Sequence, residues 1–269
     1  MKASTNKTSN ILENLTVKVR DMCIRSEQKS MPYFTGFLSP EEQVCVLKEA
    51  KEHSGIFVVS FGGFEGAERK IAGIFPHDCY KQPESADEFE EYEQMAELCY
   101  VKIEGSGFVN IGHRDVLGSV MSLGLKREVL GDIIVTDDSK CAYMPVKQSS
   151  AEYICANLER VARDKVRVKL VDKMHLPEKK QKFSDMVLTV SSVRLDGLVS
   201  AMTNLSRDKA KKLIVSGKVA INHSECTSCD TQFSAGDTIT VKGEGKFYVE
   251  DFLGLTSKEK HRIVVRKYI

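Results

Sequence analysis

The residues best suited to bind a ligand form a short basic segment in the C-terminal third of the chain. Its cationic side chains are those of Arg207, Lys209, Lys211, Lys212 and Lys218. Ser206 is a favourable helix N-cap and Gly217 a favourable residue for leaving a helix in the left-handed conformation, so a short basic helix is predicted. Arg207 and Lys211 are four residues apart and share a helix face, where a bound anion would offset their repulsion. Phosphate is the anion that such a helix edge suits best.

A second segment has the residue types of a zinc site. His223, Cys226 and Cys229 have the spacing H-x-x-C-x-x-C, which supplies three ligands. A structural zinc site needs four, and no second Cys pair lies nearby in the sequence. We therefore predict no metal site here.

The remaining motifs that could support catalysis are incomplete. His113-Arg114-Asp115 resembles a kinase catalytic loop, but position 120 is Val where Asn is required. Gly105-Ser106-Gly107 is not followed by the third Gly of a dinucleotide-binding loop, and no Walker A sequence occurs. Arg194-Leu195-Asp196 matches the catalytic tripeptide of pseudouridine synthases, yet here it opens a predicted helix. We expect Asp196 to be a cap or salt-bridge partner, and we predict no catalytic residue, cofactor or small-molecule substrate.

The N-terminal segment reads as mixed helix and strand. Apolar residues at three- and four-residue steps from Leu12 to Cys23 predict an amphipathic helix. Ser39-Pro40-Glu41-Glu42 predicts the start of a second helix with a capping box. The apolar run 56–61 and the segment 69–75 are expected to be strands joined by a Gly-rich turn.

The middle segment has an order of elements typical of one fold. We expect strands at 96–104, 131–136, 141–146 and 165–171, a helix capped by Asp115 and another helix at 150–162. The order β-α-β-β-α-β is that of the ferredoxin-like fold, which RNA-recognition (RRM-like) modules share. Such modules stack bases on sheet aromatics, but the candidate central strand offers Tyr143 alone. RNA contacts of this region are therefore expected from Arg69, Lys70, His113, Arg114, Lys126 and Arg127.

After a charged linker around 176–180, the C-terminal segment resembles the S4-type (αL) RNA-binding domain. The resemblance covers about Val190 to Val241. It rests on Arg194-Leu195-Asp196, on Gly236-Asp237 and on the types and spacing of seven residues between them: Ser206, Arg207, Ala210, Ile214, Gly217, Val219 and Asn222. It implies that two helices and the following strand face RNA. Carried over residue by residue, the resemblance nominates Arg194, Arg207, Lys211 and Lys218. Ser206 and Asn222, which belong to the same pattern, are also predicted site residues, and charge alone adds Lys209, Lys212 and Lys246. From this, we expect that the double change Arg207→Glu with Lys211→Glu abolishes ribosome binding while stability stays nearly intact.

Motifs in the first two segments narrow the resemblance. The stretches 61–70 and 113–127, followed by Gly131-Asp132-Ile133, are similar to signatures of the bacterial YlmH family. This resemblance implies an α+β protein with three domains: an N-terminal α/β domain (1–80), an RRM-like domain (81–183) and an S4 domain (184–269). It also implies a non-enzymatic cytoplasmic monomer that binds ribosomal RNA or tRNA on the large ribosomal subunit in translation quality control, with a gene often found among cell-division genes.

Charge and hydropathy agree with such a protein. The 269 residues carry a net charge of +1, but residues 184–269 hold 13 Lys+Arg against 10 Asp+Glu and the first 183 hold 26 against 28. Residues 160–182 are locally basic, and 84–97 are acidic. No stretch predicts a membrane span or a secretory signal, so the eight cysteines are expected to be thiols in the cytoplasm. Two alternatives stay open: an RNA-modifying enzyme, and a division-linked scaffold that uses the acidic segment.

Overall fold

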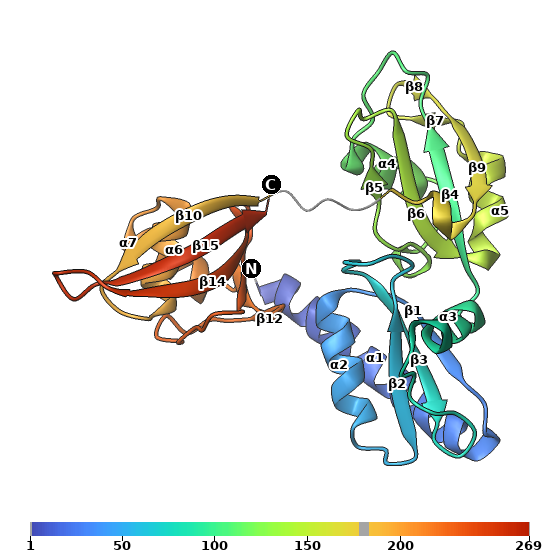
Figure 1. Ribbon diagram of the computed structural model, residues 1–269, viewed down its shortest axis with the longest axis horizontal. Helices are drawn as coiled ribbons and strands as arrows, with labels where there is room; N and C mark the ends of the chain where they lie inside the picture. Colours follow the sequence, from blue (N-terminus) through green and yellow to red (C-terminus); the bar gives the residue numbers. More distant parts are fainter. Residues whose placement is uncertain (1, 178–182, 269) are drawn as a thin grey trace. The chain divides into compact units, whose positions relative to one another are not determined.

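The protein is a mixed α+β molecule built as two compact units. The computed structural model describes residues 2–177 and 183–268, and side chains from Asn10 onward. The N-terminal unit comprises residues 1–179 and the C-terminal unit residues 180–269 (Figure 1). Residues 178–180 of the predicted linker lie outside the described residues. All eight cysteines are free thiols.

The first sheet of the N-terminal unit has three antiparallel strands in the order β1-β3-β2. Its strands and the two helices packed on it are α1 (Lys2–Lys29), β1 (Tyr33–Leu38), α2 (Pro40–Ala50), β2 (Ile56–Phe61) and β3 (Lys70–Pro76). The predicted capping box is confirmed, because the Ser39 N–H donates to Glu42 Oε2 at 2.6 Å and the Glu42 N–H to Ser39 Oγ at 3.3 Å. One core joins α1 and α2 to the sheet, and a second, aromatic core contains Phe57, Phe61 and Phe75.

The second sheet of this unit has four antiparallel strands in the order β5-β6-β4-β9. Along the chain come α3 (Ala86–Met95), β4 (Leu98–Glu104), α4 (His113–Met121), the 3-10 turn η1 (Arg127–Val129), β5 (Ile134–Val135), β6 (Cys141–Lys147), α5 (Gln148–Asn157), the hairpin β7 (Arg160–Val161) and β8 (Asp164–Lys165), β9 (Arg167–Val171) and the 3-10 turn η2 (Lys173–His175). Val101, Met144, Val116 and Ile154 contribute to the buried core between this sheet and α4 and α5. The acidic segment forms α3, in which Glu93 is buried and pairs with Lys173.

Three predictions for this segment were wrong in detail. Asp115 is not the N-cap of α4; that residue is Gly112, whose N–H donates to Asp115 Oδ2 at 3.1 Å. The helix expected at 150–162 ends at Asn157, because Val161 turns into the β7–β8 hairpin. The strand expected at 131–136 pairs as a regular strand only at Ile134 and Val135.

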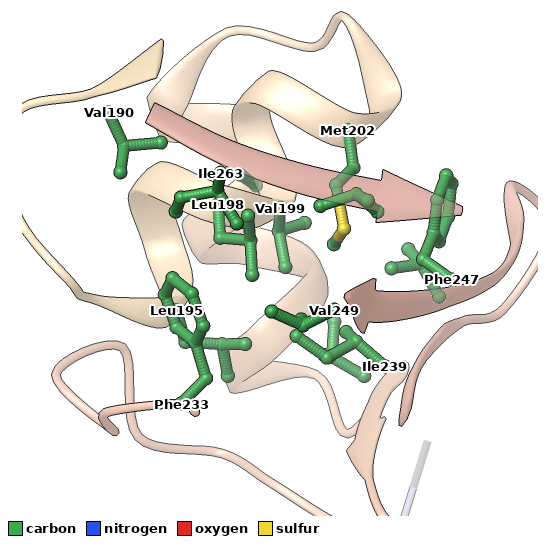
Figure 2. Close-up of a cluster of buried hydrophobic side chains, with 14 of the residues drawn as sticks. Val190, Leu195, Leu198, Val199, Met202, Phe233, Ile239, Phe247, Val249 and Ile263 are labelled. Atoms are coloured by element: carbon green, nitrogen blue, oxygen red, sulfur yellow. The ribbon is translucent and has the colours of Figure 1, made fainter. Parts of the chain in front are cut away.

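The C-terminal unit is a six-stranded antiparallel sheet covered on one face by two helices. Its elements are β10 (Phe183–Val190), α6 (Leu195–Thr203), α7 (Arg207–Val215), β11 (Val219–Ile221), β12 (Ser224–Glu225), β13 (Thr238–Val241), β14 (Gly245–Leu255) and β15 (His261–Tyr268). The strand order is β10-β15-β14-β13-β11-β12. Figure 2 shows the core, in which Leu198 and Met202 of α6 meet Phe247, Val249 and Ile263 of the sheet.

The helices were also compared with the length and hydropathy of a membrane-spanning helix. Within the described residues, we find no helix whose length and apolar character would let it span a membrane.

Candidate nucleic-acid interface

The exposed side of α7 carries a row of lysines. Ala210 and Ile214 are buried against the core, which turns Lys209, Lys211 and Lys212 toward solvent. The predicted ends of this helix are confirmed. Ser206 is the N-cap, and its Oγ accepts from the Lys209 N–H at 3.4 Å.

Gly217 ends the helix for a reason of space as well as conformation. Its φ is +68°, and a Cβ there would lie 2.3 Å from Glu225 Oε1. A larger residue would have to displace the end of the Glu225 side chain and also adopt a left-handed φ, which residues other than glycine rarely do.

A buried carboxylate fixes the two helices relative to each other. Asp196 in the first turn of α6 has an exposed fraction of 0%, and it accepts from Arg207 Nε at 3.0 Å and Arg207 Nη2 at 3.2 Å. Burial opposes ionisation of Asp196, but the hydrogen bonds and charge of Arg207 outweigh it and lower the pKa of the carboxylate. The same contact raises the pKa of Arg207. The expected salt bridge of Asp196 is therefore confirmed.

We call this pairing of Asp196 with Arg207 the Asp196 clamp, and it contradicts one expectation of the sequence analysis. Arg207 was expected to be replaceable by Glu without loss of stability. A glutamate at 207 would instead bring a second negative charge against the buried carboxylate of Asp196, and the clamp would be lost.

Arg194 continues the clamp into the loop that precedes β13. Its Nε lies 3.4 Å from Asp196 Oδ1, and its guanidinium pairs with Asp230. The Leu195 N–H also donates to the Thr231 carbonyl at 2.9 Å. The loop residue Cys226 packs against the core and has its Sγ 3.1 Å from Thr231 Oγ1. Across the described parts of the chain, no group of three or more His, Cys, Asp or Glu residues could hold a metal ion.

Lys218 has a neighbour that the sequence analysis missed. The Lys242 N–H donates to the Lys218 carbonyl at 2.8 Å, beside the paired residues Val219 and Val241. Both lysine side chains are exposed. The pairing of β11 with β13 brings these two lysines together, although they are 24 positions apart in the sequence. The one signal in the sequence is the alternation of polar and apolar residues at 238–242, which predicts a strand there.

Three other predicted residues have different surroundings. Ser206 serves as the cap described above. Asn222 lies in a left-handed turn, and its amide group donates to Asp237 Oδ1 at 2.7 Å and accepts from the Thr238 N–H at 2.9 Å. Lys246 lies 4.8 Å above the ring of Tyr268, on the sheet face away from the helices, because its neighbour Phe247 points into the core.

In the N-terminal unit, two predicted arginines bond to the backbone. Arg69 Nη2 donates to the Phe37 carbonyl at 2.5 Å, and its Nε donates to the Leu130 carbonyl at 3.3 Å. Arg127 Nη1 donates to the Leu130 and Gly131 carbonyls at 2.6 and 3.1 Å. Burial lowers the pKa of Arg69, and burial followed by the charge of Arg69 lowers the pKa of Arg127 to about 10. These side chains tie the first sheet to the η1–β5 region.

The other predicted cations of this unit are dispersed. His113 and Arg114 are exposed in the first turn of α4, Lys126 is exposed with its Nζ 3.7 Å from Glu128 Oε1, and Lys70 is half-buried at the start of β3. On the sheet face away from α4 and α5, Lys102 lies 5.8 Å from the ring centroid of Tyr143.

The chain is similar to known proteins in one segment and over most of its length. Residues 88–175 match a family model described as "Putative RNA-binding domain in YlmH". The "Ribosome-associated protein quality control protein P2" of Bacillus subtilis (strain 168) is 30% identical over 235 residues, covering 87% of this chain and 86% of that protein. The solved structure of the cell division protein ylmH from Streptococcus pneumoniae is 23% identical with a TM-score of 0.47, covering 60% of this chain and 92% of that one.

Proposed function

Since the chain belongs to the YlmH family, we propose that it is a non-catalytic RNA-binding protein of translation quality control. Its target is structured ribosomal RNA or tRNA on the large ribosomal subunit. The proposal includes a cytoplasmic monomer that needs no cofactor and no small-molecule substrate. The relative from Bacillus subtilis, which is named as ribosome-associated, supports the ribosomal target.

The observation that carries the proposal is the exposed basic surface of the C-terminal unit. We define this lysine surface as Lys209, Lys211, Lys212, Lys218 and Lys242. Lysines on a fixed helix and a neighbouring strand edge can neutralise several phosphates at once and release their counterions. Arg194 and Arg207 flank the surface, and each keeps more than 40% of its side chain exposed while holding Asp196.

We further propose the finer domain assignments. Residues 184–269 form an S4-type domain, which the two helices and the strand β11 that follows them support. Residues 81–183 form an RRM-like domain, which the sheet order β5-β6-β4-β9 and the order of the elements support. Residues 1–80 are the N-terminal domain. Contacts of the RRM-like domain with RNA come from His113, Arg114 and Lys126, while Arg69 and Arg127 hold the fold.

A pseudouridine synthase would use the aspartate of Arg194-Leu195-Asp196 as a catalytic residue. In this chain, the carboxylate of Asp196 has no exposed surface and is held by two arginines. A nucleophile must reach its substrate. We therefore favour binding over RNA modification.

The test is co-sedimentation of the full chain with purified large ribosomal subunits. The variant Lys211→Glu with Lys212→Glu reverses two exposed charges of the lysine surface without touching the Asp196 clamp. We expect it to lose subunit binding at physiological salt, because about two phosphate contacts become repulsions. A matched control is Lys258→Glu with Lys260→Glu, which makes the same charge change in the exposed turn between β14 and β15.

The control should bind as the unchanged protein does, and both variants should keep its unfolding free energy within about 0.5 kcal/mol. Equal binding by both variants and the unchanged protein would contradict the proposal. Equal loss in both would mean that bulk charge, rather than this surface, attracts RNA.

A further inference from the structure

The loop between β4 and α4 presents an aromatic side chain to solvent. Phe108 has an exposed fraction of 94%, and the next residue, Val109, has one of 44%. The loop lies at the same end of the second sheet as the β7–β8 hairpin (Figure 1). A single exposed apolar residue is ordinary on a protein surface. Phe108 differs from such a residue because hydrogen bonds hold its loop in place and charged residues lie on the adjoining elements.

The loop is held by hydrogen bonds on both sides of Phe108. The Ser106 N–H and Oγ both donate to the carboxylate of Asp164, at 2.9 and 2.5 Å. Ser106 Oγ also accepts from the Phe108 N–H at 3.3 Å. Asp164 is buried, and these bonds lower its pKa, so it acts as a charged anchor for the loop.

The other side of the loop is fastened to the turn between β5 and β6. The Gly105 N–H donates to the Lys140 carbonyl at 2.9 Å, and the Ile111 N–H donates to the Ser139 carbonyl at 2.9 Å. Lys140 Nζ donates to Asn110 Oδ1 at 3.2 Å. Phe108 is therefore displayed by a braced loop, and ordering it on a ligand costs little entropy.

Two glycines let the chain take this path. A Cβ at Gly105 would lie 2.7 Å from Asp164 Oδ2, against the anchor itself. Gly107 has a φ of +88°, which other residues rarely adopt, although open space surrounds it. The backbone before Phe108 is thus turned outward at a position that only glycine tolerates well.

Exposed cations occur on the two elements that adjoin this loop, the β7–β8 hairpin and α4. Asp164, whose carboxylate holds Ser106, belongs to the β7–β8 hairpin, and its chain neighbours Arg163 and Lys165 are both exposed. Arg114 is exposed in the first turn of α4, which the loop enters. The locally basic stretch that begins at Arg160 is thereby folded back to the tip of this sheet.

Several nearby acidic groups are engaged with the backbone of the same loops. Besides Asp164, Asp138 accepts from the Lys140 N–H at 3.0 Å, and Asp115 accepts from the Gly112 N–H at 3.1 Å. Asp137 also lies at this end, and so does Glu104, the last residue of β4, whose Oε1 lies 3.3 Å from Lys102 Nζ. Asp164, Asp138 and Asp115 thus bond to backbone N–H groups of these turns, while Arg163 and Lys165 of the hairpin are exposed.

We propose that this loop is a further RNA contact, in which Phe108 stacks on an unpaired base and Arg163 and Lys165 bind the adjacent phosphates. The inference rests on the proposed function and adds that the RNA bound at this end has an unpaired base. A nucleobase fits one aromatic side chain among cations, because stacking uses one ring face and the charges take the backbone. A protein partner would need a wider apolar area than Phe108 and Val109 offer.

Site-specific photocrosslinking tests the partner directly. The full chain carries p-benzoylphenylalanine in place of Phe108 and is irradiated with purified large ribosomal subunits. We expect a crosslink to RNA that nuclease treatment shortens. The same photoreactive residue at Lys211 serves as the positive control for the lysine surface. A crosslink from position 108 to protein alone, or none while position 211 reacts, would overturn the proposal.

Affinity measurements separate stacking from simple proximity. Phe108→Ala should weaken subunit binding by about 5- to 100-fold, the range typical of losing one base–aromatic stack, and Phe108→Trp should restore it. The control is Tyr153→Ala, which removes a 46% exposed aromatic side chain from α5, a helix that packs on the second sheet. Arg163→Gln should reduce the steepness of the salt dependence.

The outcomes distinguish this inference from the proposed function. If the double lysine variant loses binding and Phe108→Ala binds as the unchanged protein does, the function stands and the stacking contact is wrong. If neither variant changes binding, both are wrong. Because Phe108 is almost fully exposed, its replacement is expected to leave the folded state intact, which circular dichroism can check.

Discussion

Arginine has a different partner in each unit of this molecule. In the N-terminal unit, Arg69 and Arg127 donate to backbone carbonyls where the first sheet meets the η1–β5 region. In the C-terminal unit, Arg207 and Arg194 hold the buried carboxylate of Asp196 between the two helices. The lysines that sequence analysis grouped with these arginines are mostly exposed in both units.

The difference teaches that positive charge in a sequence has two separate uses. A guanidinium has five donors in a planar fork and is weakly hydrated, so it can satisfy several acceptors when partly buried. An ammonium is compact and strongly hydrated, which favours its exposure. In this protein, the exposed lysines are therefore the better candidates for phosphate contacts than Arg69, Arg127, Arg194 and Arg207, whose guanidinium groups already hold acceptors of the protein.

The largest expected effect comes from reversing the arginine of the C-terminal clamp. Arg207→Glu should lower the unfolding free energy of the C-terminal unit by about 2–3 kcal/mol, because it leaves Asp196 buried beside a like charge, although solvent at the half-exposed arginine moderates the cost. Lys211→Glu, one turn further along the same helix, should cost less than about 0.5 kcal/mol. Urea unfolding with hydrogen exchange at the α6 and α7 amides measures both. Similar losses in the two variants would break the distinction between arginine and lysine.

A smaller effect is expected from the arginine of the N-terminal unit. Arg69→Met keeps much of the side-chain volume but leaves the carbonyls of Phe37 and Leu130 without this donor, which should cost about 2 kcal/mol. Arg114→Met, at an exposed position, is the matched control and should be nearly neutral. Subunit binding of the folded Arg69→Met protein should be unchanged. A stable variant with weakened binding would instead make Arg69 an RNA contact.

The smallest expected effect is the loss of stability that protonation of Asp196, in the C-terminal unit, causes at low pH. The pKa of Asp196 is lowered in the folded state, so its contribution to stability is present above the unfolded pKa, near 3.9, and is lost as the pH falls through the folded value. The unchanged protein should therefore lose stability as the pH drops below about 4. Asp196→Asn should be less stable at neutral pH and should lack this part of the acid loss. An identical acid slope in the two proteins, measured by urea unfolding from pH 3 to 6, would remove Asp196 as the charged partner.

Local signals placed much of the fold correctly. Ser39 with Glu42, Ser206 and Gly217 mark helix ends because each satisfies backbone groups or a backbone conformation within a few residues. The wrong end of α5 has the opposite cause. Val161 continues the apolar spacing of a helix, but its pairing in the β7–β8 hairpin depends on Asp164, which is anchored to the distant Ser106.

The part of the candidate site that depends on local sequence was also predictable. The α7 lysines lie on one helix, so their shared exposure follows from helical spacing. Lys242 was missed because its position beside Lys218 depends on strand pairing. Lys246 was grouped with the α7 lysines by charge, yet strand alternation turns it to the opposite sheet face. Phe108 carried no signal beyond its Gly-rich surroundings.

The sequence by itself determined the types and ends of most elements, the resemblance that led to the family, and the lysines that line α7. Tertiary structure alone decided which cations face solvent and which hold acceptors, because burial and partners depend on residues far apart along the chain. Asp196 is the plainest example. Its neighbours in sequence suggest a cap, and only the packing of α7 against α6 makes it the charged centre of a clamp.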